Sequence, residues 1–332
     1  MVLFNIKIYL KAEDGIFYEV EYQKNGDIVI KARNPVQNIP KLIGPSIRPG
    51  EYAETFSVYT DCNGYQAMIP PGWMVSGLPQ ESVIWGQDLG LVIYKIPKTK
   101  VKELNWDNPI TVDEIRQQYN QFVWVPSIPE EVKLKKEIYI SIYQERYRNN
   151  PIYHCEDAAV NAVQQEMKSM QKYHGFFVSR YYISKTENGI PMSVKGNKPW
   201  TSVDYIEART ASYTLEDSQE VHTHLLFEQE CISMIQWINK SGTKLLETSD
   251  TESSLVYKAK RKLFPKKIKE TGENPDLSVN NIADFKSNLA VLTDGNLIPN
   301  VYSLQNGEFK IVSIGRLCKD KDIGFRVAMY MD

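Results

Sequence analysis

The residue types that act as nucleophiles or bind transition metals are few in this chain, and they are scattered. The cysteines are Cys62, Cys155, Cys231 and Cys318, and the histidines are His154, His174, His222 and His224. Cysteines that bind a metal or exchange disulfides usually come as closely spaced pairs, and this sequence has no such pair. Thiols far apart in sequence are typical of a protein made in a reducing cytosol. The spacing therefore predicts neither a cysteine metal site nor a disulfide framework.

Two short clusters bring chemically active types together. In His222-Thr223-His224 the imidazoles share one face if the segment is extended, and Glu228 or Glu230 would add a carboxylate ligand. We favour the alternative, in which this segment enters a helix and lacks a third ligand. His154-Cys155-Glu156-Asp157 are neighbours in sequence, whereas a catalytic Cys–His dyad is normally assembled from distant positions. We interpret that segment as a surface turn whose acidic residues cap the following helix.

Composition and charge exclude several classes of partner. The 332 residues are 42% hydrophobic and 24% charged, with 39 basic and 41 acidic residues and a net charge of -2. This balance gives no general attraction to nucleic acid or to anionic membranes. The basic run 258–269 has few aromatic residues for stacking on bases, so a solvated loop or an acidic protein partner is the better interpretation. The sequence shows no secretory signal at its start and no apolar run that could span a membrane.

The N-terminal part is expected to be rich in β-strands. Alternating apolar and polar residues, separated by Asp-Gly and Asn-Gly turn residues, predict a meander of strands at 4–10, 17–22 and 28–32. Residues 35–49 are rich in proline and predict an irregular crossing. Further strands are expected within 67–77 and 90–96. A helix is expected from Thr111, through a capping box with Glu114, to about Phe122.

The remainder mixes helices and strands. Helical periodicity predicts helices over 157–174 with Gly175 as the C-cap, over 203–213 with Ser202 as the N-cap, and over 227–239. Strands are expected at 122–126, 176–184, 309–314 and 324–330. The polar segment 245–279 is expected to be a long surface excursion.

The order of six segments resembles the formylglycine-generating, sulfatase-modifying family. Phe122–Pro126 is similar to its opening VWIPGG strand, Gly175–Ser184 to GRYEVT and Val203–Ala208 to VSWEDA. His224–Glu230 is similar to RLPTEAE, Asn281–Asn288 to NxxDMxGN, and Gly324–Val327 matches GFRV. The resemblance implies a C-type-lectin-like fold over about residues 121–332, with a small twisted antiparallel sheet, a few helices and long loops. The Ile69–Trp73 segment, with Trp85-Gly86 and Gly90–Tyr94, resembles a branch found in tail and virion proteins of phages of Gram-positive bacteria.

The departures from that family concern its chemistry. Oxidase members carry two cysteines shortly after an RGGSW strand, and those thiolates hold copper, whereas here only Cys318 follows the matching segment Lys310–Arg316. Val291 stands where the family has a glutamate that helps to hold calcium, and Leu292 stands where it has a tryptophan. A hard cation needs oxygen ligands, which valine lacks. We therefore expect no catalytic residue, no metal and no cofactor.

These inferences combine into an α+β fold with three parts. We expect a β-rich docking domain at 1–60, a connecting β-hairpin and helix at 61–120, and a C-type-lectin-like domain at 121–332. The expected function is that of a non-enzymatic phage virion protein (tail, baseplate, neck or capsid-decorating) in protein–protein docking or host-surface adhesion. It would be made in the bacterial host cytoplasm and present in several copies or as a homo-oligomer. Its partners would be other virion proteins and possible attachment sites on the bacterial cell surface, but not nucleic acid or membrane. The ligand or partner surface is expected at Tyr302, Arg316, Leu317, Cys318, Lys319, Asp320 and Lys321.

Two alternatives remain open at this point. One is a formylglycine-generating-like or non-haem iron oxidase, which would need a redox metal. The other is a bacterial interaction module that is encoded in a prophage but has no place in a particle.

Overall fold

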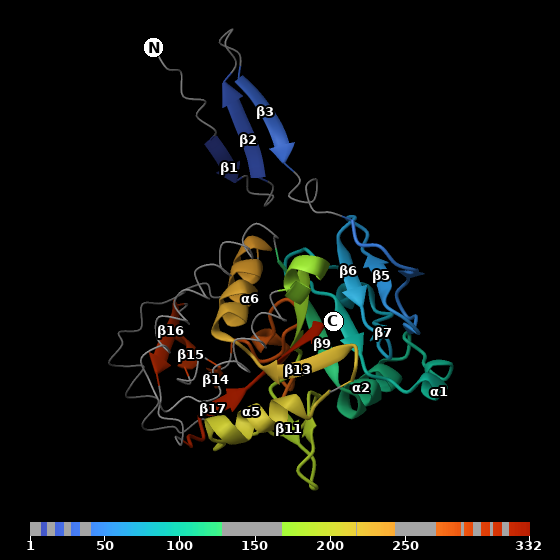
Figure 1. Ribbon diagram of the computed structural model, residues 1–332, viewed down its shortest axis with the longest axis vertical. Coiled ribbons are helices and arrows are strands. Elements are labelled where there is room, and N and C mark those ends of the chain that lie inside the picture. Colours follow the sequence, from blue (N-terminus) through green and yellow to red (C-terminus); the bar gives the residue numbers. More distant parts are fainter. Residues whose placement is uncertain are drawn as a thin grey trace.

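The computed structural model describes residues 8–11, 17–22, 28–33, 41–127, 168–216, 218–242, 270–286, 289–294, 300–305, 308–313 and 319–332. These residues form a mixed α+β structure with several sheets, which confirms the predicted fold class at that level (Figure 1). The segments 154–157 and 258–269 lie outside the described residues.

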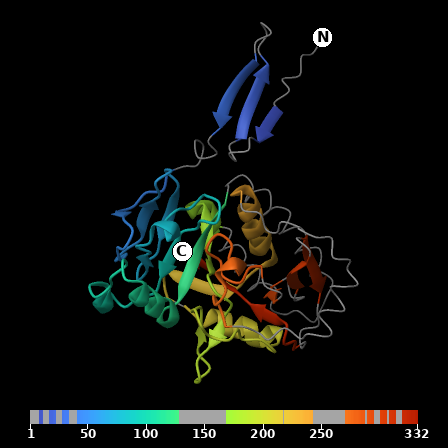
Figure 2. The same ribbon diagram turned by 180° about the vertical axis from the view of Figure 1, so that it is seen from behind.

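The N-terminal strands form a sheet of their own, drawn blue in Figures 1 and 2. Strands β1 (Ile8–Lys11), β2 (Phe17–Tyr22) and β3 (Ile28–Arg33) are antiparallel, in the order β1-β2-β3. The predicted meander is confirmed, because alternation and turn residues are local properties that sequence records directly.

A six-stranded antiparallel sheet forms the centre of the molecule, in the order β13-β18-β10-β9-β8-β7. Its strands are β7 (Met74–Val75), β8 (Val92–Tyr94), β9 (Gln121–Pro126), β10 (Gly175–Ser179), β13 (Val221–Leu225) and β18 (Val327–Met331). Strands β7 and β8 come from the segment expected to be a connector, and they pair into the same sheet as the strands after residue 120. The division of the chain near residue 120 stays an interpretation, since the sheet runs across it.

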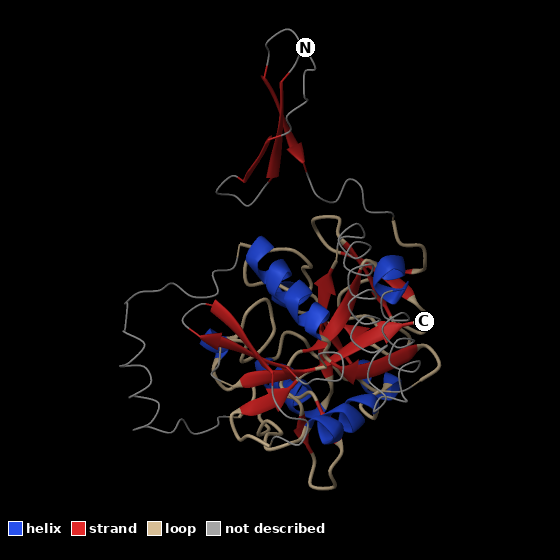
Figure 3. Ribbon diagram, turned by 60° about the vertical axis from the view of Figure 1, so that its left-hand side comes forward, coloured by secondary structure: helices blue, strands red, loops and turns tan. Residues whose placement is uncertain are grey.

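Both faces of the central sheet are buried. Phe122, Trp124 and Phe177 pack into one hydrophobic core, while Val123 and Phe176, which alternate with them, pack into a second. Helix α5 (Tyr205–Tyr213) contributes to the first core and helix α6 (Glu228–Lys240) to the second, so the helices cover opposite faces (Figure 1). Helices lie around the outside of the strands in Figure 3 as well. Burial on both faces explains why β9 and β10 are almost wholly apolar.

Smaller sheets flank the central one. Strands β4 (Ser46–Ile47), β5 (Ser57–Thr60) and β6 (Gln66–Ile69) form one, and β11 (Ser184–Lys185) and β12 (Pro191–Met192) form a hairpin. Strands β14 (Ala290–Thr293), β15 (Asn300–Gln305), β16 (Glu308–Ser313) and β17 (Ile323–Phe325) form another, in the order β16-β15-β14-β17. The predicted strand 324–330 is therefore two strands, β17 and β18, and Arg326 lies between them.

The other helices are short. They are α1 (Lys98–Val101) and α2 (Pro109–Gln118), the 3-10 helices η2 (Pro79–Glu81) and η3 (Pro275–Leu277), and a helical segment at 168–173. Among the described residues no helix is both long and apolar enough to cross a membrane.

Two predicted N-caps were wrong. Helix α2 is capped by Asn108, whose side chain accepts a hydrogen bond from the Ile110 N–H, and not by Thr111. Pro109 in the first turn favours this earlier start because a helix leaves that N–H unused. Helix α5 is capped by Asp204, which accepts from the Glu207 N–H, and not by Ser202. In both helices the residue that acts as the cap lies two or three positions from the one predicted.

The predicted C-cap at Gly175 was also wrong. His174 takes the left-handed conformation, with φ 64°, and Gly175 is already the first residue of β10. A Cβ at Gly175 would collide with the Trp124 ring and lie 2.6 Å from the Val125 carbonyl oxygen. Gly175 is required by the close approach of β9, not by helix termination.

Candidate functional site

The predicted partner surface is partly described, and it adjoins α5. The Lys319 ammonium lies 3.0 Å from a Glu207 carboxylate oxygen and 3.5 Å from one of Asp204. The Ser202 N–H donates to the Asp320 carbonyl at 3.0 Å, and Lys321 is exposed. Tyr302 lies in β15 opposite Val291 and Ile311; its side chain, and residues Arg316, Leu317 and Cys318, fall outside the described part. The described members thus lie at the N-terminal end of α5.

The histidine cluster forms two separate pairs. His222 and His224 lie in strand β13, so the prediction that they enter a helix was wrong, and α6 begins only at Glu228. The His222 Nε2 lies 3.0 Å from an Asp332 oxygen, and the His224 Nε2 lies 3.0 Å from Glu230. Glu230 also accepts from the Phe227 N–H at the start of α6. Within the described ranges no group of three or more His, Cys, Asp or Glu side chains could hold a metal.

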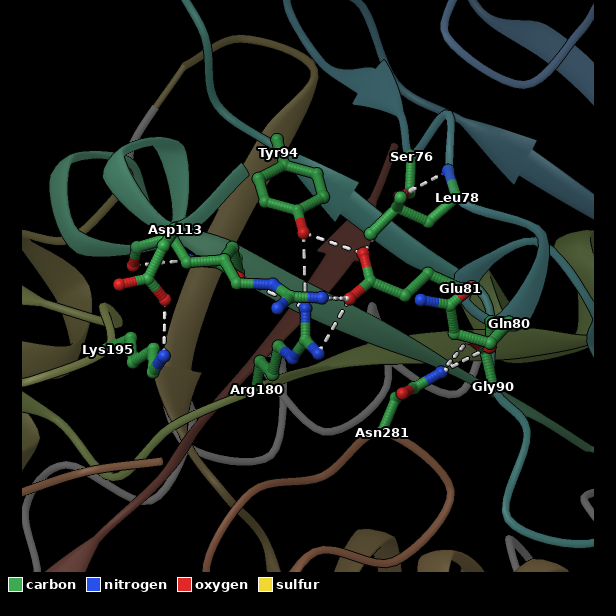
Figure 4. A network of polar contacts seen from close by, with 12 residues as sticks. Ser76, Leu78, Gln80, Glu81, Gly90, Tyr94, Asp113, Arg180, Lys195 and Asn281 are labelled. Carbon is green, nitrogen blue, oxygen red and sulfur yellow. Dashed lines mark hydrogen bonds and ion pairs between the residues drawn. The ribbon is translucent and has the colours of Figure 1, made fainter. Parts of the chain in front are cut away.

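A buried carboxylate, Glu81, is the centre of an extensive polar network (Figure 4). One carboxylate oxygen accepts from Tyr94 at 2.6 Å and from Ser76 at 2.8 Å. The other pairs with Arg180 at 2.8 Å and with Arg116. Both oxygens are therefore occupied by two donors each.

The charges in this network stabilise one another. Burial raises the pKa of Glu81, but the charges of Arg180 and Arg116 and the Tyr94 hydrogen bond outweigh it and lower that pKa to about 2. Burial, followed by the Glu81 charge, raises the pKa of Tyr94. Burial lowers the pKa of Arg180, and the Glu81 charge more than reverses this. Glu81 stays ionised, and Tyr94 stays a hydrogen-bond donor.

The network joins segments that are far apart in sequence. Glu81 ends η2, Tyr94 ends β8, Arg116 lies in α2 and Arg180 follows β10. Arg180 also donates to the Gln121 side-chain oxygen at 3.2 Å. The arrangement can hold these elements in place. A general base needs a free lone pair near its substrate, and both oxygens of Glu81 already accept from two donors. We therefore interpret the network as structural.

Asn281 adds a second link between the N-terminal and C-terminal halves. Its side-chain amide donates to the carbonyls of Gln80 and Gly90, both at 2.8 Å, as Figure 4 shows. A Cβ at Gly90 would collide with the Asn280 carbonyl. The chain passes so close here that only glycine fits.

Arg326 is a second buried residue with several polar partners, and its side chain contacts two chain segments. Its guanidinium donates to the carbonyls of Ser179 and Arg180, both at 3.0 Å, and of Ala283, at 2.5 Å. It also lies 4.2 Å from the centre of the Tyr182 ring. Burial lowers the pKa of Arg326, against the opposing effects of Tyr182 and Asp284. These carbonyls spread the charge over several dipoles and replace the water that a buried arginine loses.

The segments that Arg326 contacts are among the six that carry the family resemblance. Arg326 itself lies in Gly324–Val327, Ser179 and Arg180 lie in Gly175–Ser184, and Ala283 lies in 281–288. The Arg326 carbonyl accepts from the Leu226 N–H at 3.1 Å, which brings in a fourth segment, 224–230. Motifs up to about 150 residues apart in sequence meet at one residue, Arg326, through its side chain and its backbone.

Comparisons with known proteins give no further guide. No protein-family model, no curated protein and no solved structure matches the chain.

Proposed function

We propose that this chain is a non-enzymatic phage virion protein whose C-type-lectin-like domain, over about residues 121–332, docks to other proteins or to the host surface. The observation that carries the proposal is the meeting of four resembling segments around Arg326. Segments that resembled the family by chance would have no reason to contact one buried residue. The convergence supports the lectin-like frame, and the virion role follows from the resemblance of residues 69–94 to phage proteins.

Val291, at the position where the family has a calcium-binding glutamate, supports the loss of the family's metal site. Val291 is buried in β14 and packs in the second hydrophobic core. An apolar side chain in that place contributes to packing and offers no ligand to a cation. In this proposal the chain keeps the lectin-like fold but has lost the family's calcium site, because a functional site can be lost while the fold remains.

The docking surface would lie where Lys319, Asp320 and Lys321 meet α5. Ile206 on that helix is 57% exposed and Tyr213 is 41% exposed, one heptad further along the same face. Exposed apolar groups beside charged ones are typical of protein–protein interfaces. The N-terminal sheet would attach the chain to the particle.

The surface can be tested with the double variant Lys319→Glu and Lys321→Glu, in particle assembly and in host attachment. Lys100→Glu is the matched control, because Lys100 is also exposed and pairs with an acidic neighbour, Glu103. We expect the double variant to reduce at least one of the two activities, and the control to reduce neither. Normal assembly and normal attachment in the double variant would remove this surface from the proposal.

A further inference from the structure

Two exposed turns of the molecule contain the dipeptide Asn-Gly. The sequence has this dipeptide at 25–26, 63–64, 188–189 and 306–307, and the structure describes the second and the third of these. All four residues of the two described pairs are exposed. Gly64 and Gly189 have left-handed φ angles of 84° and 80°, and a Cβ at either would meet no neighbouring atom within 4 Å. The surrounding side chains therefore shield neither pair.

An Asn-Gly pair can react with itself, because glycine has no Cβ to obstruct the approach of its nitrogen. The glycine nitrogen gives its proton to water and forms a bond to the asparagine Cγ, and the bond from Cγ to Nδ2 breaks, so that ammonia leaves. One water then opens the resulting succinimide ring at either carbonyl, which gives aspartate or isoaspartate. Water is the only co-reactant, and nothing is oxidised or reduced.

The glycine nitrogen is held by a hydrogen bond in both turns. The Gly64 N–H donates to the Asp61 carbonyl at 3.0 Å, and the Gly189 N–H donates to the Thr186 carbonyl at 2.9 Å. Ring closure requires this nitrogen to turn toward the asparagine side chain, so each hydrogen bond must break first. The rate of the reaction in the folded chain therefore depends on how often each turn opens.

The turn at Asn63 is fastened by a buried carboxylate. Asp61 is only 6% exposed, and its side chain accepts from the backbone N–H groups of Asn63, Tyr65 and Ile84, each at 2.9 Å. Opening this turn would take hydrogen-bond donors away from a buried charge, which is costly. The Tyr65 ring also packs against Trp85, with 5.8 Å between ring centres.

The turn at Asn188 has no comparable anchor among the described residues. It joins β11 and β12, which have two residues each and form a sheet of their own. Thr186 and Ile190 close the turn through one backbone hydrogen bond of 2.9 Å and one from the Ile190 N–H to the Thr186 hydroxyl, at 3.1 Å. Ile190 is 58% exposed, and the hairpin projects from the body at the bottom of Figure 1. Water can replace these hydrogen bonds when the turn opens, so opening costs little.

We infer that Asn188 is a modification site, which converts to aspartate and isoaspartate in the folded protein without an enzyme, while the fold protects Asn63. The conversion adds a negative charge beside Glu187. The isoaspartate product also inserts a methylene into the backbone between β11 and β12. The inference goes beyond the proposed function and does not depend on it.

The test is to incubate the full, folded chain at neutral pH and to follow both asparagines by peptide mapping. Digestion at acidic pH suppresses further reaction during preparation, and electron-transfer fragmentation in the mass spectrometer distinguishes isoaspartate from aspartate. We expect Asn188 to be converted about tenfold faster than Asn63, because the turn at Asn63 opens less often.

The same chain unfolded in urea is the matched control, because it keeps both sequences and removes both turns. There the two asparagines should react at rates within about twofold of each other. Equal rates in the folded chain, or an unmodified Asn188 after a time in which the unfolded chain has reacted, would overturn the inference. A tenfold difference that persists in urea would also overturn it, since the cause would then lie in the neighbouring residues and not in the fold.

Discussion

Replacing Glu81 with glutamine tests whether the buried network holds the molecule together. Glutamine keeps the size of the side chain but removes the charge that Arg180 and Arg116 share. Leaving a buried charge without its partner costs about 3–5 kcal/mol. The pKa of Glu81, lowered from 4.5 to about 2, gives a similar value of about 3 kcal/mol at neutral pH.

The pH dependence gives the prediction a sign. A carboxyl whose pKa is lowered by folding stabilises the protein above its unfolded pKa, here 4.5, and that contribution disappears as the pH falls toward about 2. The difference between Glu81→Gln and the unmodified chain should therefore be about 3 kcal/mol at pH 7 and roughly 1 kcal/mol at pH 3.

The assay is the free energy of unfolding from urea denaturation at both pH values. Asp113→Asn is the control, because Asp113 pairs with Lys195 near the surface, where an ion pair contributes less than about 1 kcal/mol. If Glu81→Gln lost less than about 1 kcal/mol at pH 7, or lost as much at pH 3 as at pH 7, the proposed electrostatic role of Glu81 would be incorrect.

Three further predictions address Arg326, the close approach and the metal. Arg326→Lys should lower the free energy of unfolding by about 3 kcal/mol, because an ammonium cannot reach three carbonyls in two separate segments at once. A loss no larger than that of Lys321→Met, an exposed position, would contradict this. Gly90→Ala should lower the free energy of unfolding by about 3 kcal/mol, because the new Cβ would collide with the Asn280 backbone. Gly189→Ala is the control: it has φ 80° and open space around it, and it should lower the free energy of unfolding by only about 1 kcal/mol. Equal losses in urea denaturation would be evidence against the close approach at Gly90. Metal analysis of the purified chain should find no stoichiometric copper or iron, and finding either would favour the oxidase alternative.

The parts of the fold that sequence predicted are those set by local pattern. The meander at 8–33, strand β9 and helix α6 follow from alternation or helical periodicity within a single segment. Helix ends were less predictable, because several cap residues compete within a few positions, as Asn108 and Thr111 do. The order of strands in the central sheet depends on pairings between distant segments, which a single sequence does not record.

The polar contacts around Glu81 and Arg326 were missed for a similar reason. Glu81, Arg116 and Arg180 lie in three segments, and their sequence neighbours give no sign that the charges meet. Arg180 did carry one signal, since it stands in an otherwise apolar and aromatic stretch, where a charge needs a partner. Arg326 belongs to the segment that matches GFRV, but the sequence did not indicate which residues it would contact in the folded chain.

Quantitative mass spectrometry of purified phage particles tests the central claim most directly, in a culture whose cells express this chain. The account predicts that the chain co-purifies with the particles at a fixed ratio to the capsid protein, through repeated density gradients. A chain that stays in the cell lysate while the capsid protein enters the particle fraction would contradict it.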